Sequence, residues 1–145
     1  APSSITRLQN MGTPDYLISA AVSLILAQRL ARKTCPNCRV PDEDITPKAL
    51  ADFGFTVEQA SRAKVQKGEG CSQCKDSGYK GRMGIYEILS VSKPIKEAIL
   101  RKATTPELKE IAMKEGFRTM QDMGRELILT GDLNFREFDR VLSSE

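Results

Sequence analysis

The sequence predicts an α+β protein that is mostly helical, with a tetracysteine zinc-binding subdomain containing a short hairpin and a C-terminal helical bundle behind it. Three observations predict this class: two C-x-x-C pairs, a β-prone segment after the second pair, and several apolar-periodic segments bounded by Pro and Gly. We therefore divide the chain into residues 1–34 with a long buried helix, residues 35–90 as the zinc subdomain, and residues 91–145 as the C-terminal helical subdomain.

The composition of the chain argues against a nucleic-acid-binding surface and against a membrane-spanning segment. The 145 residues are 40% apolar, enough for one domain with a buried core. The 22 Lys and Arg residues against 19 Asp and Glu give a net charge of +3, which is far from a dense basic surface for nucleic acid. The longest apolar stretch, residues 17–27, is too short for the roughly 20 apolar residues of a membrane span. We expect a soluble chain.

The same residues argue against catalysis by this chain. Residues 1–12 show no leader pattern, so the paired cysteines are expected to be reduced in the cytoplasm. Histidine is absent, which removes the commonest general base and the usual ligands of catalytic zinc. No G-x-x-x-x-G-K-[ST] run for phosphate binding occurs either. We expect no catalytic and no nucleotide-binding residue here.

The first long element is expected to be a helix over residues 14–33. Pro14 suits a first turn, and the apolar residues of 17–26 cover overlapping helical faces, which predicts deep burial. The cations Arg29, Arg32 and Lys33 would interact favourably with the dipole at the C-terminal end of this helix. Further on, residues 47–53 and 57–64 each predict a short helix, and residues 79–89 predict a turn followed by a strand, or a hairpin.

The last third of the chain predicts four helices with clear end signals. Three cover residues 93–102, 105–114 and 119–130, with Pro or Gly at their ends. The fourth begins after Asn134, which forms an N-cap pair with Glu137. Its apolar face consists of Phe135, Phe138, Val141 and Leu142.

The strongest motif is the double cysteine pair. The four expected metal ligands are Cys35, Cys38, Cys71 and Cys74. Each C-x-x-C turn lets both thiolates reach one ion, and two turns complete the four-coordinate shell of a closed structural zinc site. Buried unpaired thiols and redox disulfides are the alternatives. Zinc would contribute folding free energy to a segment that is poor in large apolar residues.

Two further stretches carry a family resemblance. Residues 19–35, SAAVSLILAQRLARKTC, and residues 78–87, GYKGRMGIYE, resemble the type II and type IV secretion ATPase family. Within that family the chain is most similar to the members that assemble type IV pili, with the type II secretion members second. Residues 5–8 and 11–12 resemble the stretch that follows the family's histidine-containing box.

The resemblance implies the non-catalytic C-terminal part of a hexameric ATPase. The phosphate-binding loop, the catalytic acidic residues and the ATP and Mg²⁺ they hold would then lie upstream of Ala1. Expected partners are the other subunits of a homohexamer and an inner-membrane platform protein, and no nucleic acid. Residues 1–34 would end the ATPase core. The location implied is cytoplasmic, peripheral to the inner membrane, with membrane association only through partners.

Some features stay open. Gln28, Arg29 and Arg32 match a distinctive run of the family and would line a nucleotide-facing or subunit-facing surface, or interact with a helix end. Residues 131–137 depart from the family's G-x-T-x-x-E-E pattern. The alternative function is a zinc-ribbon module that binds nucleic acid or protein. A zinc-dependent chaperone module is a weaker alternative, because residues 71–78 resemble only half of its repeated motif.

Overall fold

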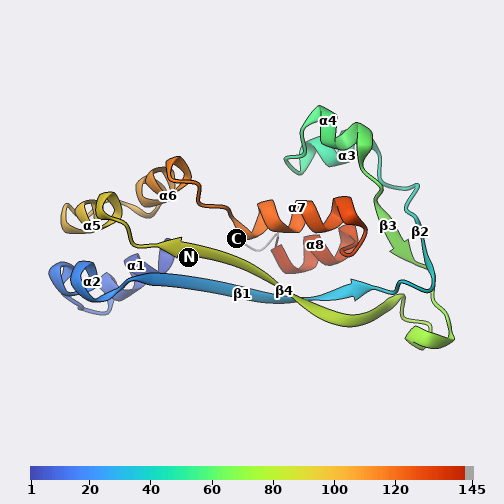
Figure 1. The fold of residues 1–145 in the computed structure, drawn as a ribbon, viewed down its shortest axis with the longest axis horizontal. Coiled ribbons are helices and arrows are strands. Elements are labelled where there is room, and N and C mark those ends of the chain that lie inside the picture. Colours follow the sequence, from blue (N-terminus) through green and yellow to red (C-terminus); the bar gives the residue numbers. More distant parts are fainter. Residues whose placement is uncertain (143–145) are drawn as a thin grey trace. The chain divides into compact units, whose positions relative to one another are not determined.

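The structure, a computed structural model, describes residues 1–142, so the last three residues of the predicted segment 91–145 lie outside the described residues. The chain forms two compact units, each built from two separate stretches. The first unit contains Ala1–Gln28 and Tyr86–Thr119, and the second contains Arg29–Ile85 and the residues from Met120 onward. Figure 1 colours the elements of both units in chain order. The predicted α+β class is confirmed.

The predicted helix over residues 14–33 is wrong. A short helix, α2 (Asp15–Ala21), ends where Val22 adopts an extended backbone with φ −88° and ψ 118°, and strand β1 (Leu24–Thr34) follows. Apolar residues on both faces of this strand imitate the wide apolar face of a helix. Burial alternates along β1, and Leu24, Leu26 and Leu30 are half-exposed. Pairing with a second strand therefore overrides the helix propensity of Leu, Ala, Gln and Arg.

The partner of β1 is strand β4 (Tyr79–Ser90), which together with it forms a two-stranded sheet. At one end the amide of Val91 donates to the carbonyl of Ser23, and at the other the amide of Cys35 donates to the carbonyl of Gly78. This order of partners is that of an antiparallel pair. The segment predicted as strand or hairpin is thus one long strand.

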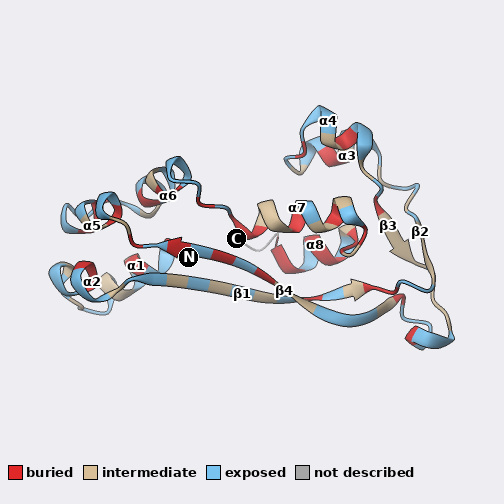
Figure 2. Ribbon diagram, in the orientation of Figure 1, coloured by how far each residue is buried: buried red, intermediate tan, exposed pale blue. Residues whose placement is uncertain are grey.

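The first unit packs four helices around an apolar core. They are α1 (Ser3–Asn10), α2, α5 (Lys93–Leu100) and α6 (Thr105–Lys114). The core residues are Ile5, Ile18, Leu89, Val91, Ile95, Ala98, Ile99, Ala103, Leu108, Ala112 and Phe117, and Figure 2 shows buried positions on these elements. Thr104 caps α6 through a reciprocal bond pair with Glu107, as its sequence spacing suggests.

The second unit carries the cysteines and the remaining elements. Its helices are α3 (Pro47–Asp52), α4 (Val57–Arg62), α7 (Met120–Thr130) and α8 (Phe135–Leu142), with a 3₁₀ turn η1 (Ser72–Cys74). Strands β2 (Arg39–Pro41) and β3 (Gln66–Gly68) pair in antiparallel register. The short helices α3 and α4 lie where the sequence predicts them. Thr46 and Thr56 are their N-caps and stabilise their first turns.

The helices α7 and α8 pack closely within the second unit. Gly124 of α7 leaves room for Phe138 and Leu142, since a Cβ on it would lie only 2.5 Å from a methyl of Leu142. Phe53, just after α3, meets Phe135 edge to face at 4.5 Å between ring centroids. A single C-terminal bundle is not confirmed, because α5 and α6 belong to the first unit. No helix within residues 1–142 has the length and apolar character to cross a membrane.

Candidate metal centre

The four cysteines come together through the pairing of β2 with β3. Cys35 directly follows β1 and Cys38 precedes β2, while Cys71 precedes the turn η1 after β3 and Cys74 is the last residue of that turn. The register places Arg39, next to Cys38, opposite Gly68. Because antiparallel strands bring the start of one beside the end of the other, the two C-x-x-C turns meet at the same end of the sheet.

The sulfur positions have the spacing of a tetrahedral thiolate site. All four Sγ atoms lie within 4.8 Å of one another. The Sγ atoms of Cys35 and Cys71 are 3.8 Å apart, those of Cys38 and Cys74 also 3.8 Å, and those of Cys71 and Cys74 3.6 Å. A Zn–S bond of about 2.3 Å places tetrahedral sulfurs roughly 3.8 Å apart. The donor set therefore fits one zinc ion.

Two glycines let the backbone segments that enter and leave the second cysteine turn approach each other. A Cβ on Gly68 would lie 2.2 Å from the carbonyl oxygen of Gly78, and a Cβ on Gly78 would lie 2.6 Å from that of Gly68. Gly78 also has φ of +80°, in the left-handed region that favours glycine. Any larger residue at either position would push apart the two segments that flank the second cysteine turn.

Backbone amides point at the sulfurs and favour thiolates. The amide of Gly70 donates to Cys38 at 3.3 Å, and the amides of Cys71 and Gly78 donate to Cys74 at 3.2 Å. Burial acts to raise the pKa of Cys74, but these donors outweigh it and lower the pKa to about 6. Burial raises the pKa of Cys38 to about 11. A bound cation would deprotonate all four thiols.

Arg39 links the first cysteine turn to the loop between α7 and α8. Its Nη2 donates to the carbonyl of Thr34 at 3.2 Å and to the carboxylate of Asp132 at 3.3 Å. The backbone amide of Thr34 also donates to the carbonyl of Asp132 at 2.9 Å. These contacts anchor the start of the cysteine loop on the helical part of the same unit.

Glu137 is the centre of a second charged cluster, which the sequence did not predict. Its carboxylate is fully buried and accepts from Arg32 and Arg140, each in a bidentate arrangement. Burial acts to raise the pKa of Glu137, but the hydrogen bonds from the two arginines lower it to about 2. The predicted N-cap bond is present as well, from the amide of Glu137 to Asn134 at 2.7 Å. The N-cap bond and the i,i+3 spacing of Glu137 and Arg140 are local features of the sequence, whereas the contact with Arg32 has no signal in the sequence spacing.

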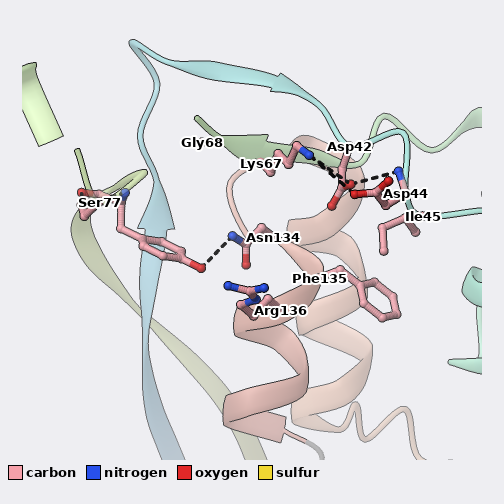
Figure 3. A pocket seen from close by; sticks show the side chains of 10 residues that line it. Asp42, Asp44, Ile45, Lys67, Gly68, Ser77, Asn134, Phe135 and Arg136 are labelled. Carbon is pink, nitrogen blue, oxygen red and sulfur yellow. Dashed lines mark hydrogen bonds and ion pairs between the residues drawn. The ribbon is translucent and has the colours of Figure 1, made fainter. Parts of the chain in front are cut away.

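A cavity of about 390 Å³ lies beside β3 in the second unit, with Gly68 and Ser77 in its wall. The Nζ of Lys67 lies 4.0 Å from a carboxylate oxygen of Asp42 and 3.7 Å from one of Asp44. Figure 3 shows these side chains together with Arg136 and Asn134 at the start of α8. Two acidic and two basic side chains line this cavity, so their charges balance. It selects no class of charged ligand.

The structure places Arg29 and Arg32 in a strand and not at the end of a helix. Arg29 lies in β1, where its Nη1 donates to the carbonyl of Val141 at 2.7 Å. Arg32 lies in the same strand and contacts Glu137. The interpretation that these cations act on the end of their own helix is therefore wrong, because residues 28–33 form a strand. Arg29 instead binds the carboxyl end of α8.

Comparison with known proteins identifies the family of the chain. The model of the family described as "Type II/IV secretion system protein" matches residues 1–140. The chain is 36% identical over 94% of its length to the type IV pilus assembly ATPase PilB of Myxococcus xanthus, and 38% identical over 94% to PilB of Thermus thermophilus. It is 33% identical over 95% of its length to type II secretion system protein E of Klebsiella pneumoniae.

The chain spans only a part of these curated relatives. It covers 24% of the Myxococcus protein, 15% of the Thermus protein and 27% of the Klebsiella protein. The match therefore concerns one region of longer proteins.

Proposed function

Because the chain belongs to the type II/IV secretion system protein family, we propose that it is the C-terminal, non-catalytic part of an ATPase that powers type IV pilus assembly or type II secretion. The names of the relatives support this role, since they include both pilus assembly ATPases and type II secretion proteins. In this proposal the part of the parent that holds ATP and Mg²⁺ lies outside the 145 residues.

We propose that zinc is the structural staple of this region, held by Cys35, Cys38, Cys71 and Cys74. The observation that carries the proposal is the spacing of the four sulfurs, all within 4.8 Å. Four thiolates leave no open position for water or substrate. Zinc would fix the two cysteine turns against each other, and so hold residues 35–90 as one piece.

The cysteine region has little apolar core of its own, which supports a staple. Between Cys35 and the start of β4, the only large buried apolar residues are Leu50, Phe55 and Val65. The strands β2 and β3 each have three residues, too few to hold a sheet together without support. Zinc–thiolate bonds contribute on the order of 10 kcal/mol in small domains of this kind.

The chain itself is expected to do no chemistry. It contains no phosphate-binding G-x-x-x-x-G-K-[ST] run and no histidine. In the parent, we propose that this region transmits force between subunits of a homohexamer and an inner-membrane platform protein. Its location would be cytoplasmic, peripheral to the inner membrane, with membrane association only through partners.

The experiment that tests this role is Cys71→Ser in the full-length parent. If zinc stiffens a force-transmitting part, the variant should lose most pilus extension or secretion while its nucleotide affinity falls only slightly. Hexamer content and soluble yield are measured beside both, because loss of metal also lowers stability. Normal transport by an intact, zinc-free hexamer would contradict the proposal.

Ser72→Ala is the matched control, because Ser72 lies in the same turn, is exposed and supplies no sulfur. It should leave transport, zinc content and nucleotide affinity unchanged. The alternative function, a zinc-ribbon module for nucleic acid, would instead show salt-dependent binding of the chain to DNA. That result would replace the motor proposal for this region.

A further inference from the structure

We propose that Arg32, Arg82 and Arg140 form a binding site for a phosphate group in the second unit. They line a cavity of about 490 Å³ together with Leu30 and Ala31. Arg32 comes from β1, Arg82 from β4 and Arg140 from α8. Three elements far apart in the sequence thus present guanidinium groups to one space, and none of the described residues that line it is acidic.

Within residues 1–142, the positive charge of the cluster exceeds the negative charge that pairs with it. Glu137 accepts from Arg32 and Arg140, so three guanidinium groups face one carboxylate and two positive charges are left over. The side chain of Arg82 forms no ion pair with any residue from 1 to 142. This excess distinguishes the cavity from the charge-balanced one beside β3.

The two arginines that bind Glu137 are held in fixed orientations. Each uses Nε and Nη2 for the carboxylate, which leaves Nη1 without an acceptor in the described part of the chain. The guanidinium of Arg32 also stacks over the ring of Tyr79, 4.0 Å from its centroid. A donor array that is already ordered loses less side-chain entropy when it binds an anion.

Asn134 contacts two residues of this arrangement, Tyr79 and Glu137. Its Nδ2 donates to the hydroxyl of Tyr79 at 2.9 Å, and its Oδ1 accepts from the amide of Glu137 at 2.7 Å. The ring that supports Arg32 and the carboxylate that orients Arg32 and Arg140 are therefore fixed by one residue. Asn134 and Glu137 are positioning residues in this site, since neither lines the cavity.

The ligand that fits best is a phosphate or polyphosphate. Guanidinium groups bind phosphate oxygens in bidentate pairs, and a phosphate dianion matches an excess of two positive charges better than a single carboxylate does. None of the described side chains that line the cavity is aromatic, so none of them would stack on a nucleobase. The site should thus recognise the phosphate chain of a nucleotide no better than the same chain in free tripolyphosphate.

If the arginines served only to neutralise Glu137, Arg82 would have no part in the cluster. Arg82 is therefore the residue that separates ligand binding from internal charge balance. It is exposed, and because its side chain has no ion pair within the described chain, Arg82→Gln should leave the unfolding free energy unchanged. Arg136→Gln is the matched control, because it makes the same charge change in the same unit but lines the other cavity.

The test is isothermal titration of the zinc-loaded 145-residue chain with tripolyphosphate at low salt. Arg82→Gln should weaken binding about tenfold, the loss expected for one charge-assisted hydrogen-bond pair, and Arg136→Gln should change it less than about twofold. ATP should bind within about threefold of tripolyphosphate, and the dicarboxylate succinate at least about tenfold more weakly.

Three results would overturn the proposal. The first is no saturable binding by the wild-type chain. The second is an equal loss in Arg82→Gln and Arg136→Gln, which would indicate general charge attraction. The third is succinate binding as tightly as tripolyphosphate, or ATP binding far more tightly than it. Chemical denaturation of each variant confirms that a changed affinity does not come from unfolding.

Discussion

The Nη2 atom of Arg39 lies 3.3 Å from the carboxylate of Asp132, and this ion pair joins the first cysteine turn to the loop that connects α7 and α8. The same Nη2 donates to the carbonyl of Thr34, a residue that is fully buried. Arg39→Ala would therefore remove the donor of a buried carbonyl as well as one half of an ion pair.

We expect Arg39→Ala to lower the unfolding free energy by about 1.5 to 3 kcal/mol, the range for hydrogen bonds that involve a charged group. Arg62→Ala is the control, because its pair with Glu58 is exposed on both sides and such pairs contribute about 0 to 0.5 kcal/mol. Urea denaturation measures both. An equal loss in the two variants would show that the Arg39 contacts add nothing beyond a surface pair.

Glu137 predicts a specific pH dependence of stability. Its pKa in the folded protein is about 2, below the ordinary value of 4.5, because the hydrogen bonds from Arg140 and Arg32 outweigh the effect of burial. A lowered folded-state pKa stabilises the protein above the unfolded value and loses that contribution as pH falls toward the folded value. The contribution of Glu137 should thus disappear between about pH 5 and pH 2.

Glu137→Gln isolates this effect. Near neutral pH the variant should be less stable by about 3 kcal/mol, since it removes the charge that two arginines bind. The difference from wild type should shrink as the pH falls through the same window. A difference that stays constant from pH 7 to pH 3 would show that the charge of Glu137 is not what stabilises the cluster.

The packing of α7 on α8 depends on the absence of a side chain at Gly124. Ala is the better helix former by about 1 kcal/mol, so on propensity alone Gly124→Ala would stabilise α7. A Cβ there would lie 2.5 Å from Leu142 and 2.7 Å from Phe138, and we expect a net loss of about 1 to 3 kcal/mol from overpacking. Thermal unfolding measures it, and a higher melting temperature would contradict the described packing.

The short helices could be predicted because their signals are local. Thr104 with Glu107, and Thr56 with Gln59, form capping boxes within four residues, and Pro106 lies in the first turn of α6. The cluster of four cysteines could be predicted from the sequence as well, because each C-x-x-C pair is a local motif and the fold need only bring the two pairs together. The structure brings them within 4.8 Å.

Strand β1 and the arginine cluster could not be predicted in this way. Residues 24–34 consist of good helix formers, and what makes them a strand is β4, more than 40 residues later in the chain. One partner of Glu137 is also remote, since Arg32 lies 105 residues away in sequence, whereas Arg140 lies in the same helix. Such contacts depend on the tertiary fold, and no periodicity or capping residue in the sequence predicts them.

Removal of one cysteine ligand should show which segments depend on the metal. In Cys38→Ser, amide protection should be lost first across residues 35–85, while α1, α2, α5 and α6 of the first unit keep theirs. Hydrogen exchange measures this segment by segment. If α7 and α8 lose protection together with the cysteine segment, the ion pair of Arg39 and Asp132 couples these helices to that segment. Uniform loss across both units would contradict a separate, metal-dependent segment.

The most direct measurement is the metal content and coordination of the purified, reduced chain. Elemental analysis should find one zinc ion per chain, and X-ray absorption should find four sulfur neighbours at about 2.3 Å with no nitrogen or oxygen ligand. Cys74→Ser should lower the zinc content and the sulfur count together. Reduced protein that is fully folded with four free thiols and no metal would contradict the account.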